Sequence, residues 1–430
     1  MQYVGAGIET TDVVIVGSGF GGLAAAKQLN KSGVPYVLIS STPEHLFQPL
    51  LYQVATGVLP SDEIAPPIAN IIRHHKHGQA RLGKVVDIDA DAAVLTYDTA
   101  EGRKQIRYGK LIAATGASQS YFGRDEFADK TYSLKTIDDA KRLRAQIERV
   151  FEAAKNADPE TRQRLLSFVV VGAGATGVEV AGQLKELSKR YYHLDVSVTL
   201  VEGAGAVLPP FGGGLSEYAK QSLSKSGVEV LLDTFVTDIE VGKVTVKSKD
   251  GVERRIGAET VVWSAGVQAG GFTKLLAEAT GCETDRAGRL LINPDCTVGG
   301  HADIFAIGDM TSLKGYPGQS PVAMQEGRHV ADIIRGKKPA ATEFTYWDKG
   351  SMAVISRFSA VTKVNQRIRF TGTIAWFAWL AVHLFYLVGF RNRFAAVASW
   401  LVAFIGHGRP GFQEVEKDTA AQVLATQRAA

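Results

Sequence analysis

Two segments of the chain repeat one short pattern, an apolar β-branched run followed by closely spaced glycines and an alanine-rich stretch. They are "DVVIVGSGFGGLAAAKQL" and "LLSFVVVGAGATGVEVAGQL". The runs Val13–Val16 and Phe168–Val171 each predict a buried parallel strand, and the residues after the glycines predict a helix. Gly-x-Gly-x-x-Gly between a strand and a helix is typical of a dinucleotide-binding βαβ unit. The glycines are Gly17, Gly19 and Gly22 in the first copy and Gly172, Gly174 and Gly177 in the second.

The glycines of such a motif have separate roles. Gly17 allows the tight turn after the strand, Gly19 lets the backbone approach a pyrophosphate, and Gly22 lets the helix pack on the strand. The N-terminus of the helix then meets the negative charge of the phosphates. Phe20 and Gly21 lie in the same loop and are expected at the same dinucleotide. The repeat therefore predicts an α/β protein with two Rossmann-like dinucleotide-binding domains.

The residue that ends the second strand of each unit differs between the copies. In the second copy, "VSVTLVE" ends in Glu202, whose carboxylate is suited to hydrogen-bond the 2′-hydroxyl of an adenosine ribose. Residues 203–207 contain no Arg or Lys for a 2′-phosphate, so this half should prefer NAD to NADP. In the first copy, "VPYVLIS" ends in Ser40, followed by Ser41, and a hydroxyl can still reach a ribose.

Three further strand ends fit a protein that binds a flavin and a nicotinamide. "KLIAATGAS" predicts a strand running into Thr115 and Gly116, and "VVWSAGV" predicts one reaching Gly266. Both resemble the strand-then-glycine crossover of two-dinucleotide-binding flavoproteins. "ADIFAIGD" predicts a strand ending in Asp309, which in such proteins binds the ribityl chain of FAD. This order implies an FAD-binding domain (residues 1–125 and 291–345) interrupted by an NADH-binding domain (residues 126–290).

Composition argues against several other kinds of protein and binding site. A net charge of +4 on 430 residues does not indicate nucleic-acid binding. Cys282 and Cys296 form no Cys-x-x-Cys pair, which argues against a redox-active dithiol. The tract Arg73–His77 lacks partner ligands at useful spacing, so no metal site is expected. Residues 1–12 carry no apolar run after a basic stretch, so no secretory signal is expected.

The chain resembles the type II NADH:quinone oxidoreductases, the single-subunit, non-pumping respiratory NADH dehydrogenases. The resemblance runs from about Asp12 to the aromatic C-terminal segment. It is carried by "HLFQPLLYQVATG", "LKTIDDA", "GATGVE", "WSAGV", "PVAMQEG" and "DKGSMA". It implies hydride transfer from NADH to FAD and then reduction of a membrane quinone. The cofactor supplies the redox chemistry, and the protein supplies orientation, exclusion of water and hydrogen bonds.

The resemblance also implies roles for residues around the flavin. Gln48 and Gln53, in "HLFQPLLYQ", are expected near the isoalloxazine ring. Glu179 is expected to face the junction of nicotinamide and flavin. The alternative for Glu179 is an acid in the first turn of its helix, where the helix dipole favours negative charge.

Three residues are assigned to the quinone by the same resemblance. Gln325 matches the second glutamine of the family's Ala-Gln-x-x-x-Gln motif, and Pro321 stands in place of the first. This replacement shifts the expected hydrogen bonding to Gln325. Lys349, in "DKGSMA", is expected to close the quinone pocket, and the alternative is an ordinary surface lysine.

Other flavoprotein classes differ in features that the sequence displays. Disulfide reductases and sulfide:quinone oxidoreductases need redox cysteines in a pairing that this chain lacks. Soluble NADH:ferredoxin-type reductases fit the glycine motifs but not the aromatic C-terminal segment. A flavoprotein resembling apoptosis-inducing factor, with a binding or signalling role, stays open. Steady-state NADH oxidation with a short-chain quinone would separate it from a respiratory enzyme.

The aromatic C-terminal segment contains two apolar runs, Ile374–Phe390 and Phe394–Ile405. Each is shorter than the roughly 20 residues that span a bilayer, so neither is expected to cross. As a helix, the first run has one face expected at the lipid headgroups and a second expected among the acyl chains. The headgroup face consists of Trp376, Trp379, His383 and Tyr386, and the acyl face of Phe377, Leu380, Leu384 and Val388.

Arginines flank and separate these runs, which suits helices that lie beside anionic headgroups. Residues 346–430 are therefore expected to form the quinone site and a monotopic anchor on the cytoplasmic face of the inner membrane. The alternative, a dimer or core interface, fits the aromatic residues equally well but explains the arginines poorly. It does not exclude the anchor, and a homodimer is also expected, since exposed aromatic patches mark protein partners as well as lipid. The arginines are Arg367, Arg369, Arg391, Arg393 and Arg409.

Overall fold

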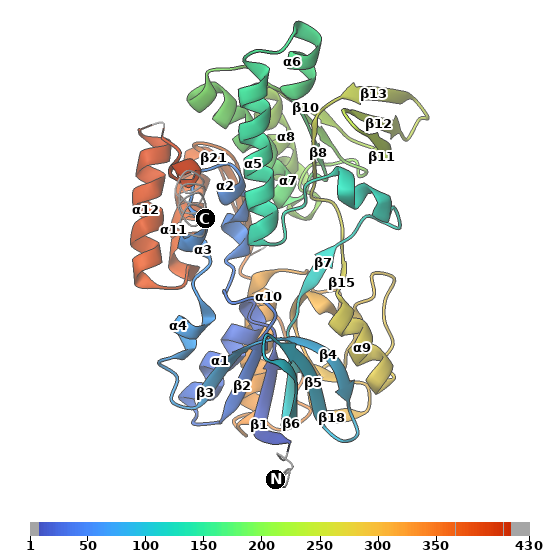
Figure 1. Cartoon of the computed structure of the whole chain (residues 1–430), viewed down its shortest axis with the longest axis vertical. Helices are drawn as coiled ribbons and strands as arrows, with labels where there is room; N and C mark the ends of the chain where they lie inside the picture. Colours follow the sequence, from blue (N-terminus) through green and yellow to red (C-terminus); the bar gives the residue numbers. More distant parts are fainter. Residues whose placement is uncertain (1–7, 366, 407, 414–430) are drawn as a thin grey trace, which may run out of the picture. The chain divides into compact units, whose positions relative to one another are not determined.

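The computed structural model describes residues 8–365, 367–406 and 408–413. Residues 1–7, most of the segment considered for a signal, and residues 414–430 of the expected C-terminal region lie outside the described residues. The chain divides into two compact units, each assembled from separate segments (Figure 1). Unit 1 comprises residues 1–45, 66–118 and 267–348, and unit 2 comprises residues 46–65, 119–266 and 349–430.

Unit 1 is built on a mixed sheet with parallel central strands. Its strands are β1 (Glu9–Val16), β2 (Tyr36–Ser40), β3 (Gly78–Leu82), β4 (Lys84–Asp89), β5 (Val94–Thr99), β6 (Gly102–Ala113), β17 (Thr297–Val298) and β18 (His301–Ala306). The order is β17-β18-β6-β1-β2-β3, with β5 antiparallel to β6 and β4 antiparallel to β5. Val13–Val16 are buried in β1, as their β-branched run predicts. Short strands β7 (Ala117–Gln119), β15 (Val267–Ala269), β16 (Leu290–Leu291) and β19 (Thr311–Ser312) form two small pairs in the described chain.

Two glycines allow the first and the last helix of unit 1 to cross in backbone contact. The helices are α1 (Phe20–Lys31), α4 (Ile68–Ile72), α9 (Gly271–Thr280) and α10 (Ser320–Ile334). A Cβ added to Gly327 of α10 would lie 2.3 Å from the carbonyl oxygen of Gly21 in α1. Only glycine fits at this crossing, so α10 is held tightly against the helix of the first glycine motif.

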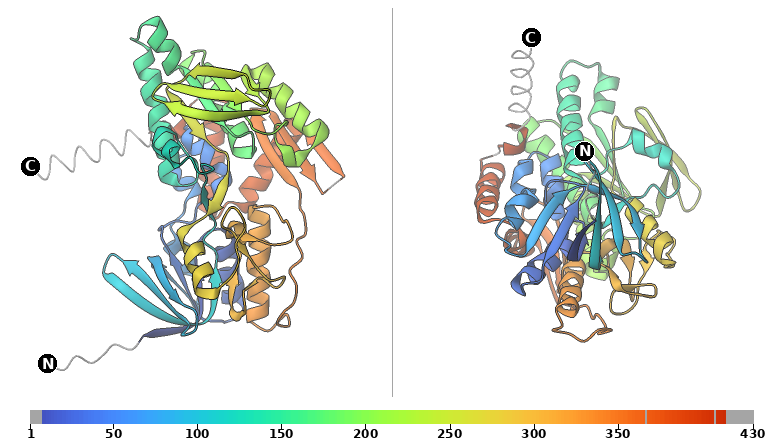
Figure 2. Two further views of the ribbon diagram at one scale, coloured as in Figure 1. Left: turned by 90° about the vertical axis from the view of Figure 1, so that its right-hand side faces the viewer. Right: turned by 60° about the horizontal axis from the view of Figure 1, so that its bottom comes forward.

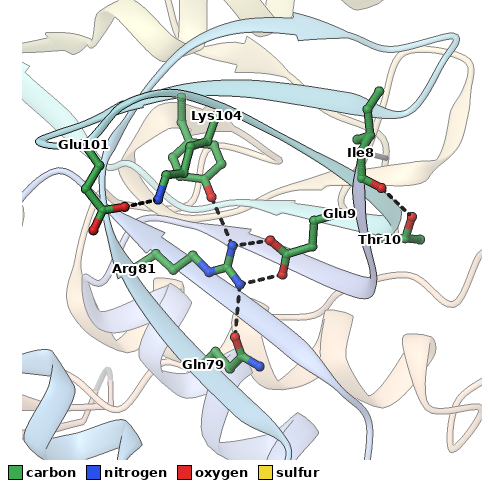
Figure 3. A network of polar contacts seen from close by, with 8 residues as sticks. Ile8, Glu9, Thr10, Gln79, Arg81, Glu101 and Lys104 are labelled. Atoms are coloured by element: carbon green, nitrogen blue, oxygen red, sulfur yellow. Dashed lines mark hydrogen bonds and ion pairs between the residues drawn. The ribbon is translucent and has the colours of Figure 1, made fainter. Parts of the chain in front are cut away.

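A network of polar contacts links side chains of β1, β3 and β5 in the unit 1 sheet. The Arg81 guanidinium of β3 forms an ion pair with Glu9 of β1 and donates to the Tyr97 hydroxyl at 3.1 Å (Figure 3). Its hydrogen bond holds the pKa of Glu9 below the usual range. Lys104 forms a neighbouring ion pair with Glu101. These pairs are partly exposed, so they contribute little to the stability of the fold.

Unit 2 contains the second glycine motif on a parallel sheet in the order β10-β9-β8-β14. Its strands are β8 (Ser167–Val171), β9 (Ser197–Val201), β10 (Val228–Leu231) and β14 (Thr260–Trp263). After β10 the chain forms a separate antiparallel sheet, drawn in yellow-green in Figure 2. Its strands are β11 (Thr234–Glu240), β12 (Lys243–Ser248) and β13 (Glu253–Gly257). Val169, Val171, Val201 and Trp263 pack with Ile239 of the antiparallel sheet in one buried core.

Helices from three parts of the sequence complete unit 2. Thr136 and Asp139 form a capping box at the start of α5, which fixes where that helix begins. The helices are α2 (Leu51–Ala55), α3 (Ser61–Ile64), α5 (Ile137–Ala154), α6 (Pro159–Leu165), α7 (Ala175–Leu187), α8 (Gly213–Ser226), α11 (Gly372–Tyr386) and α12 (Phe390–Phe404), with helical turns η1 (Gln48–Leu50) and η3 (Ser188–Tyr192). A C-terminal antiparallel sheet contains β20 (Ser351–Ser356), β21 (Ser359–Val364) and β22 (Ile368–Thr371).

The two apolar C-terminal runs form α11 and α12, as expected, but the expected headgroup face of α11 is wrong. Trp376 and Trp379 are 4% and 1% exposed, because they pack inside unit 2 against rings such as Phe404 and Trp400. A helix that is apolar on all sides buries the face with the larger rings, since these remove more area from water. None of the helices in the described residues combines the length and apolar character needed to cross a bilayer.

One of the arginines expected beside lipid headgroups is instead buried. Arg409 is 4% exposed, and its guanidinium donates to the Gln183 side chain at 3.4 Å. Burial lowers its pKa, while the nearby Glu186 carboxylate acts in the opposite direction. The segment after α12 turns back onto α7, which the sequence pattern did not indicate. Arg367, Arg369 and Arg391 are exposed, as a headgroup contact requires.

Candidate functional site

The first glycine motif forms a loop with open space above its middle glycine. Gly17 has φ +108°, and a Cβ there would lie 2.3 Å from the Ala114 carbonyl oxygen. A Cβ on Gly22 would lie 2.0 Å from the Gly17 carbonyl oxygen. Packing within the chain therefore explains both of these glycines. For Gly19, no described atom lies within 4 Å of an added Cβ, so the space belongs to solvent or a ligand.

The second motif repeats this arrangement in unit 2. Gly172 has φ +98°, and a Cβ there would lie 2.8 Å from the Ala265 backbone nitrogen. A Cβ on Gly177 would lie 1.8 Å from the Gly172 carbonyl oxygen. Again the middle glycine, Gly174, has no described atom within 4 Å of an added Cβ. Gly19 and Gly174 are the N-caps of α1 and α7, so the helix N–H groups face this space without a capping side chain.

The predicted residues of unit 1 gather at one edge of its sheet. Val16 pairs in register with Ile39 and Ala113, and Ala113 pairs with Ala306, so four parallel strands end in one row. The residues just beyond this row are Gly17, Ser40, Thr115, Gly116 and Asp309. Ligands of parallel sheets bind outside the carboxyl ends of the strands. Phe20, at the start of α1, contacts the His45 ring edge-on at 5.5 Å, and Gly21 faces Ile307.

Two side chains in this cradle, Ser40 and His45, form hydrogen bonds with Ser18. The Ser40 hydroxyl is 5% exposed and shares a 2.8 Å hydrogen bond with the Ser18 hydroxyl. His45 binds the Ser18 carbonyl oxygen through Nδ1 at 2.7 Å, and burial lowers its pKa to about 4. Its ring is therefore neutral, with Nδ1 donating. Among the described residues, the buried Nε2 has no hydrogen-bond partner, so it is an acceptor open to a hydroxyl of a bound ligand.

In unit 2, Glu202 lies at the corresponding edge of the parallel sheet. Val171, Val201 and Trp263 align across β8, β9 and β14, which brings Gly172, Glu202 and Gly266 to one side. The two Glu202 carboxylate oxygens accept from the backbone nitrogens of Ala173 at 2.6 Å and Ala204 at 2.8 Å. Each oxygen keeps a second lone pair for a ligand hydroxyl. The carboxylate is thus fixed in orientation beside the open Gly174.

Glu179 is a buried carboxyl group where α7 meets β20. It lies in the second turn of α7, so the first-turn alternative is wrong. It is 7% exposed, and its Oε1 accepts from the Val354 nitrogen at 3.3 Å. Burial raises its pKa well above the ordinary value of 4.5. One turn later, a Cβ on Gly182 would lie 1.6 Å from the Ile355 carbonyl oxygen, so glycine allows β20 to reach Glu179.

The two glutamines of residues 46–65 have different surroundings. Gln48 is exposed. Gln53 is 2% exposed, and both ends of its amide are engaged. Its Oε1 accepts from Trp400 Nε1 at 2.7 Å, and its Nε2 donates to the Tyr52 hydroxyl at 3.1 Å. The segment lies near Glu179 because α2 contacts α7, and burial and then the electrostatic interaction with Glu179 raise the pKa of Tyr52.

The expected quinone residues each bind nearby groups of their own unit. In unit 1, the Gln325 amide of α10 donates to the Trp347 carbonyl oxygen and accepts from its nitrogen, both at 3.0 Å. Pro321 occupies the first turn of α10, where a missing N–H needs no partner. In unit 2, Lys349 donates to the Tyr386 hydroxyl of α11 at 3.1 Å. Lys349 is therefore attached to the C-terminal helices.

Comparisons with known proteins agree on one family. A model of the pyridine nucleotide-disulphide oxidoreductases matches residues 11–327. The type II NADH:quinone oxidoreductase Ndh of Mycobacterium tuberculosis is 46% identical over 411 residues, covering 92% of this chain and 89% of the relative. NdhA of the same organism, also a type II NADH:quinone oxidoreductase, is 47% identical over 413 residues, covering 92% and 88%. The chain belongs to the type II NADH:quinone oxidoreductases.

A solved structure agrees with the fold of this family. NDH2 from Plasmodium falciparum, solved in complex with NADH, aligns with a TM-score of 0.85 at 19% identity, covering 93% of this chain and 99% of that chain. The two-dinucleotide-binding fold expected from the glycine motifs is confirmed. The broader family name refers to disulphide chemistry, but Cys282 and Cys296 are both buried free thiols in the structure.

Sequence reasoning missed the polar contacts that tie residues 46–65 to α12 in this type II NADH:quinone oxidoreductase. Besides the Gln53–Trp400 bond, the Ser399 hydroxyl donates to buried Glu63 at 2.7 Å. The bonded residues lie 347 and 336 positions apart. No local motif connects them. The sequence feature that indicates such contacts is the glutamate among the apolar residues of "SDEIAPPI", since a buried carboxylate requires a hydrogen-bond partner.

Proposed function

We propose that this chain oxidises NADH and reduces a membrane quinone by two electrons, without pumping protons. FAD, when bound, accepts hydride from NADH and passes electrons to the quinone. The observation that carries the proposal is the repeated cradle, with free space above Gly19 and Gly174 at two helix N-termini. A backbone that leaves such space beside helix N–H groups with no capping side chain suits the pyrophosphate of a dinucleotide.

The residues near each cradle support an assignment of one dinucleotide to each unit. Unit 1 combines Gly17–Gly22 with Thr115, Gly116 and Asp309 at the ends of four strands, and we assign FAD to it. The open Nε2 of His45 fits a hydroxyl of that cofactor. Unit 2 combines Gly172–Gly177 with Glu202, whose oriented carboxylate suits the ribose of NADH, and we assign NADH to it.

Glu179 is assigned to the junction of nicotinamide and flavin, together with Gln48 and Gln53. Its burial raises the pKa of the carboxyl group well above the ordinary value of 4.5, which favours the protonated form. A neutral carboxylic acid can donate one hydrogen bond while it accepts from Val354. In this protonated form the group holds a proton close to the assigned redox centre without placing a negative charge there. Gln53, fixed by Trp400 and Tyr52, supplies a rigid wall rather than a mobile donor.

Gln325, Pro321 and Lys349 are assigned to the quinone. The Gln325 amide holds the Trp347 backbone, two residues before Lys349, so it supports the segment that leads to the lysine. Gln325→Leu should lower quinone reduction at least tenfold while NADH-dependent reduction of ferricyanide is kept, because the dye does not need the quinone pocket. Arg328→Leu, an exposed change one turn away on α10, is the matched control. Equal loss of both activities at normal FAD content would refute the assignment.

The C-terminal helices support attachment to a lipid surface. We call the exposed apolar side chains of α11 and α12 the apolar face. They recur at helical spacing, and Phe385 and Phe390 are 69% and 75% exposed. Exposed rings beside Arg367, Arg369 and Arg391 suit a helix pair in the interface of an anionic bilayer. The remaining members of the apolar face are Ile374, Phe377, Val382, Phe394, Val397, Leu401 and Val402.

We place this attachment on the cytoplasmic face of the inner membrane, because NADH is a cytoplasmic substrate and the quinone dissolves in the bilayer. Part of the apolar face could also pair with a second copy, so a homodimer belongs to the proposal. Sedimentation in detergent would give the mass of the assembly. Labelling of a cysteine placed at Arg391 only from the far side of sealed vesicles would show instead that the segment crosses.

The experiment that tests the whole proposal uses the FAD-loaded protein with NADH and a short-chain quinone. We expect steady-state NADH oxidation that depends on the quinone and continues over many turnovers. A protein that binds FAD and NADH but turns over only once, or very slowly, would refute the enzyme assignment. That outcome would favour a binding or signalling flavoprotein.

A further inference from the structure

An exposed aromatic ring stands beside Glu202 in unit 2. Phe235 is the second residue of β11, and it is 55% exposed. The Thr234 nitrogen donates to the Glu202 carbonyl oxygen at 2.9 Å, which holds the start of β11 against the end of β9. The backbone contact therefore places Phe235 close to Glu202, the residue whose carboxylate we assign to the adenosine ribose.

The ring of Phe235 lies directly against the residue that follows Glu202. A Cβ added to Gly203 would be 2.6 Å from Cε1 of the ring and 3.0 Å from Cδ1. Gly203 does not have a positive φ, so its backbone does not require glycine. The absence of a side chain at Gly203 is instead what lets the ring lie close over the loop. One side of the ring contacts this loop, and more than half of the residue faces solvent.

The chemistry of adenosine connects a ribose bound by Glu202 to a base near this ring. In adenosine, adenine is attached to the carbon next to the one that carries the 2′-hydroxyl. If Glu202 binds a ribose hydroxyl, the base attached to that ribose therefore lies close to Gly203, the residue that follows Glu202. An exposed aromatic side chain gains by stacking on a flat base, because every base has a π-face.

We propose that Phe235 is the stacking platform for the adenine ring of NADH, with Glu202 holding the adjoining ribose. The proposal rests on NADH binding in unit 2 and adds a residue that recognises the end of the dinucleotide remote from the reaction. Binding energy from a remote part of a substrate helps to position its reacting part. Phe235 thus acts in recognition and makes no contact with the reacting atoms.

The test measures the affinity of the FAD-loaded protein for ADP-ribose by calorimetry. This probe contains the adenosine and pyrophosphate but no nicotinamide, so its binding does not depend on turnover. Phe235→Ala should weaken binding about five- to tenfold, the lower part of the range for one stacked base. Phe235→Trp should keep or strengthen it, and ADP-ribose should quench the fluorescence of the introduced indole relative to wild type.

A second variant moves the ring without removing it. Gly203→Ala adds the Cβ that would collide with Phe235, and the exposed ring can swing away without disturbing the core. It should weaken ADP-ribose binding as Phe235→Ala does, and the double variant should be no weaker than either single variant. Val241→Ala removes another exposed apolar side chain, 94% exposed, in the turn between β11 and β12, and should leave binding unchanged.

The outcomes separate this inference from the proposed enzyme. Wild-type protein that binds ADP-ribose but does not reduce quinone would refute the enzyme and leave the platform intact. Quinone reduction with unchanged ADP-ribose affinity in Phe235→Ala would refute the platform alone. In that case Phe235 would serve as a surface for another molecule. No binding of ADP-ribose to the wild type would refute the platform outright.

Discussion

At the scale of single residues, Glu179 makes the sharpest prediction about pH. Its folded-state pKa is raised by burial above the ordinary value of 4.5. At pH values between the unfolded-state pKa and the folded-state pKa of Glu179, the native state binds more protons than the unfolded state. The free energy of unfolding therefore falls as pH rises through this interval. Glu179→Gln cannot titrate, and its side-chain oxygen can still accept from Val354. We expect its stability advantage over wild type to be absent below the unfolded-state pKa, to grow as pH rises above it, and to level off above the folded-state pKa.

Urea unfolding of FAD-loaded protein at several pH values would measure this effect. Glu217→Gln changes an acid of α8 that is exposed, and it provides the control without such a trend. A difference between Glu179→Gln and wild type that does not change with pH would mean that the carboxyl group titrates normally in the folded protein.

Glu202 predicts the choice of nucleotide. Its carboxylate is fixed by Ala173 and Ala204, so it cannot swing away from a 2′-phosphate. Repulsion should cost about 2–3 kcal/mol, which corresponds to a roughly 30- to 150-fold preference for NADH in kcat/KM. Glu202→Ala with Ala204→Arg should reduce this ratio, since residue 204 is exposed and can carry the longer side chain. Ala204→Arg alone is the control, and equal kcat/KM values in wild type would contradict the assignment.

Single residues also show where reasoning from sequence ends. The positions of Gly17, Gly19 and Gly22 were predictable, because each is required by a local turn or a neighbouring helix. The bonding of Ser40 and Gln53 was not. Their partners, Ser18 and Trp400, depend on how separate segments meet, and a polar side chain in the sequence does not reveal whether its hydrogen bonds are already used.

At the scale of elements, the contact between α7 and β20 predicts a large effect of one methyl group. Gly182→Ala would place a Cβ 1.6 Å from the Ile355 carbonyl oxygen, and neither backbone can move without shifting its element. We expect a loss of about 3 kcal/mol or more in unfolding free energy. Gly214→Ala, on α8 with no described atom within 4 Å of the new Cβ, should be neutral or slightly stabilising. Thermal unfolding of both variants would measure the contrast, and equal midpoints would show that β20 moves freely.

The elements themselves were largely predictable, but their orientation was not. The strand–glycine–helix units and both C-terminal helices follow from apolar periodicity, which is a local property. The choice of buried face on α11 failed because that helix is apolar on every side. Trp376 and Trp379 pack inward because β21 and α12 lie there, and a periodicity argument contains no information about those neighbours.

For the whole molecule, the apolar face predicts how the protein associates with membranes. Phe385→Ser with Phe394→Ser removes two exposed rings without changing a buried contact. Each phenyl ring buried in lipid contributes about 1.5–3 kcal/mol, and partial insertion should give a 10- to 100-fold loss of binding to anionic phospholipid vesicles. Leu82→Ser with Val241→Ser, also exposed apolar positions, should bind as wild type does. Flotation assays measure this, and unchanged binding of the first variant would mean that the face contacts protein instead of lipid.

The bond between Gln53 and Trp400 has a consequence for how the protein is made. Its two residues are 347 positions apart, and ribosomes add roughly 5–20 residues per second, so the second partner is made about 20–70 s after the first. Throughout that interval the nascent chain holds the amide of Gln53 and the carboxylate of Glu63 without the helix that satisfies them. Unit 2 is therefore completed only as synthesis finishes. A message truncated before the codon for Phe390 would yield a polypeptide that has both glycine motifs but lacks α12. Residues 46–65 would then be left uncovered, and chaperones and proteases would bind such an incompletely folded chain.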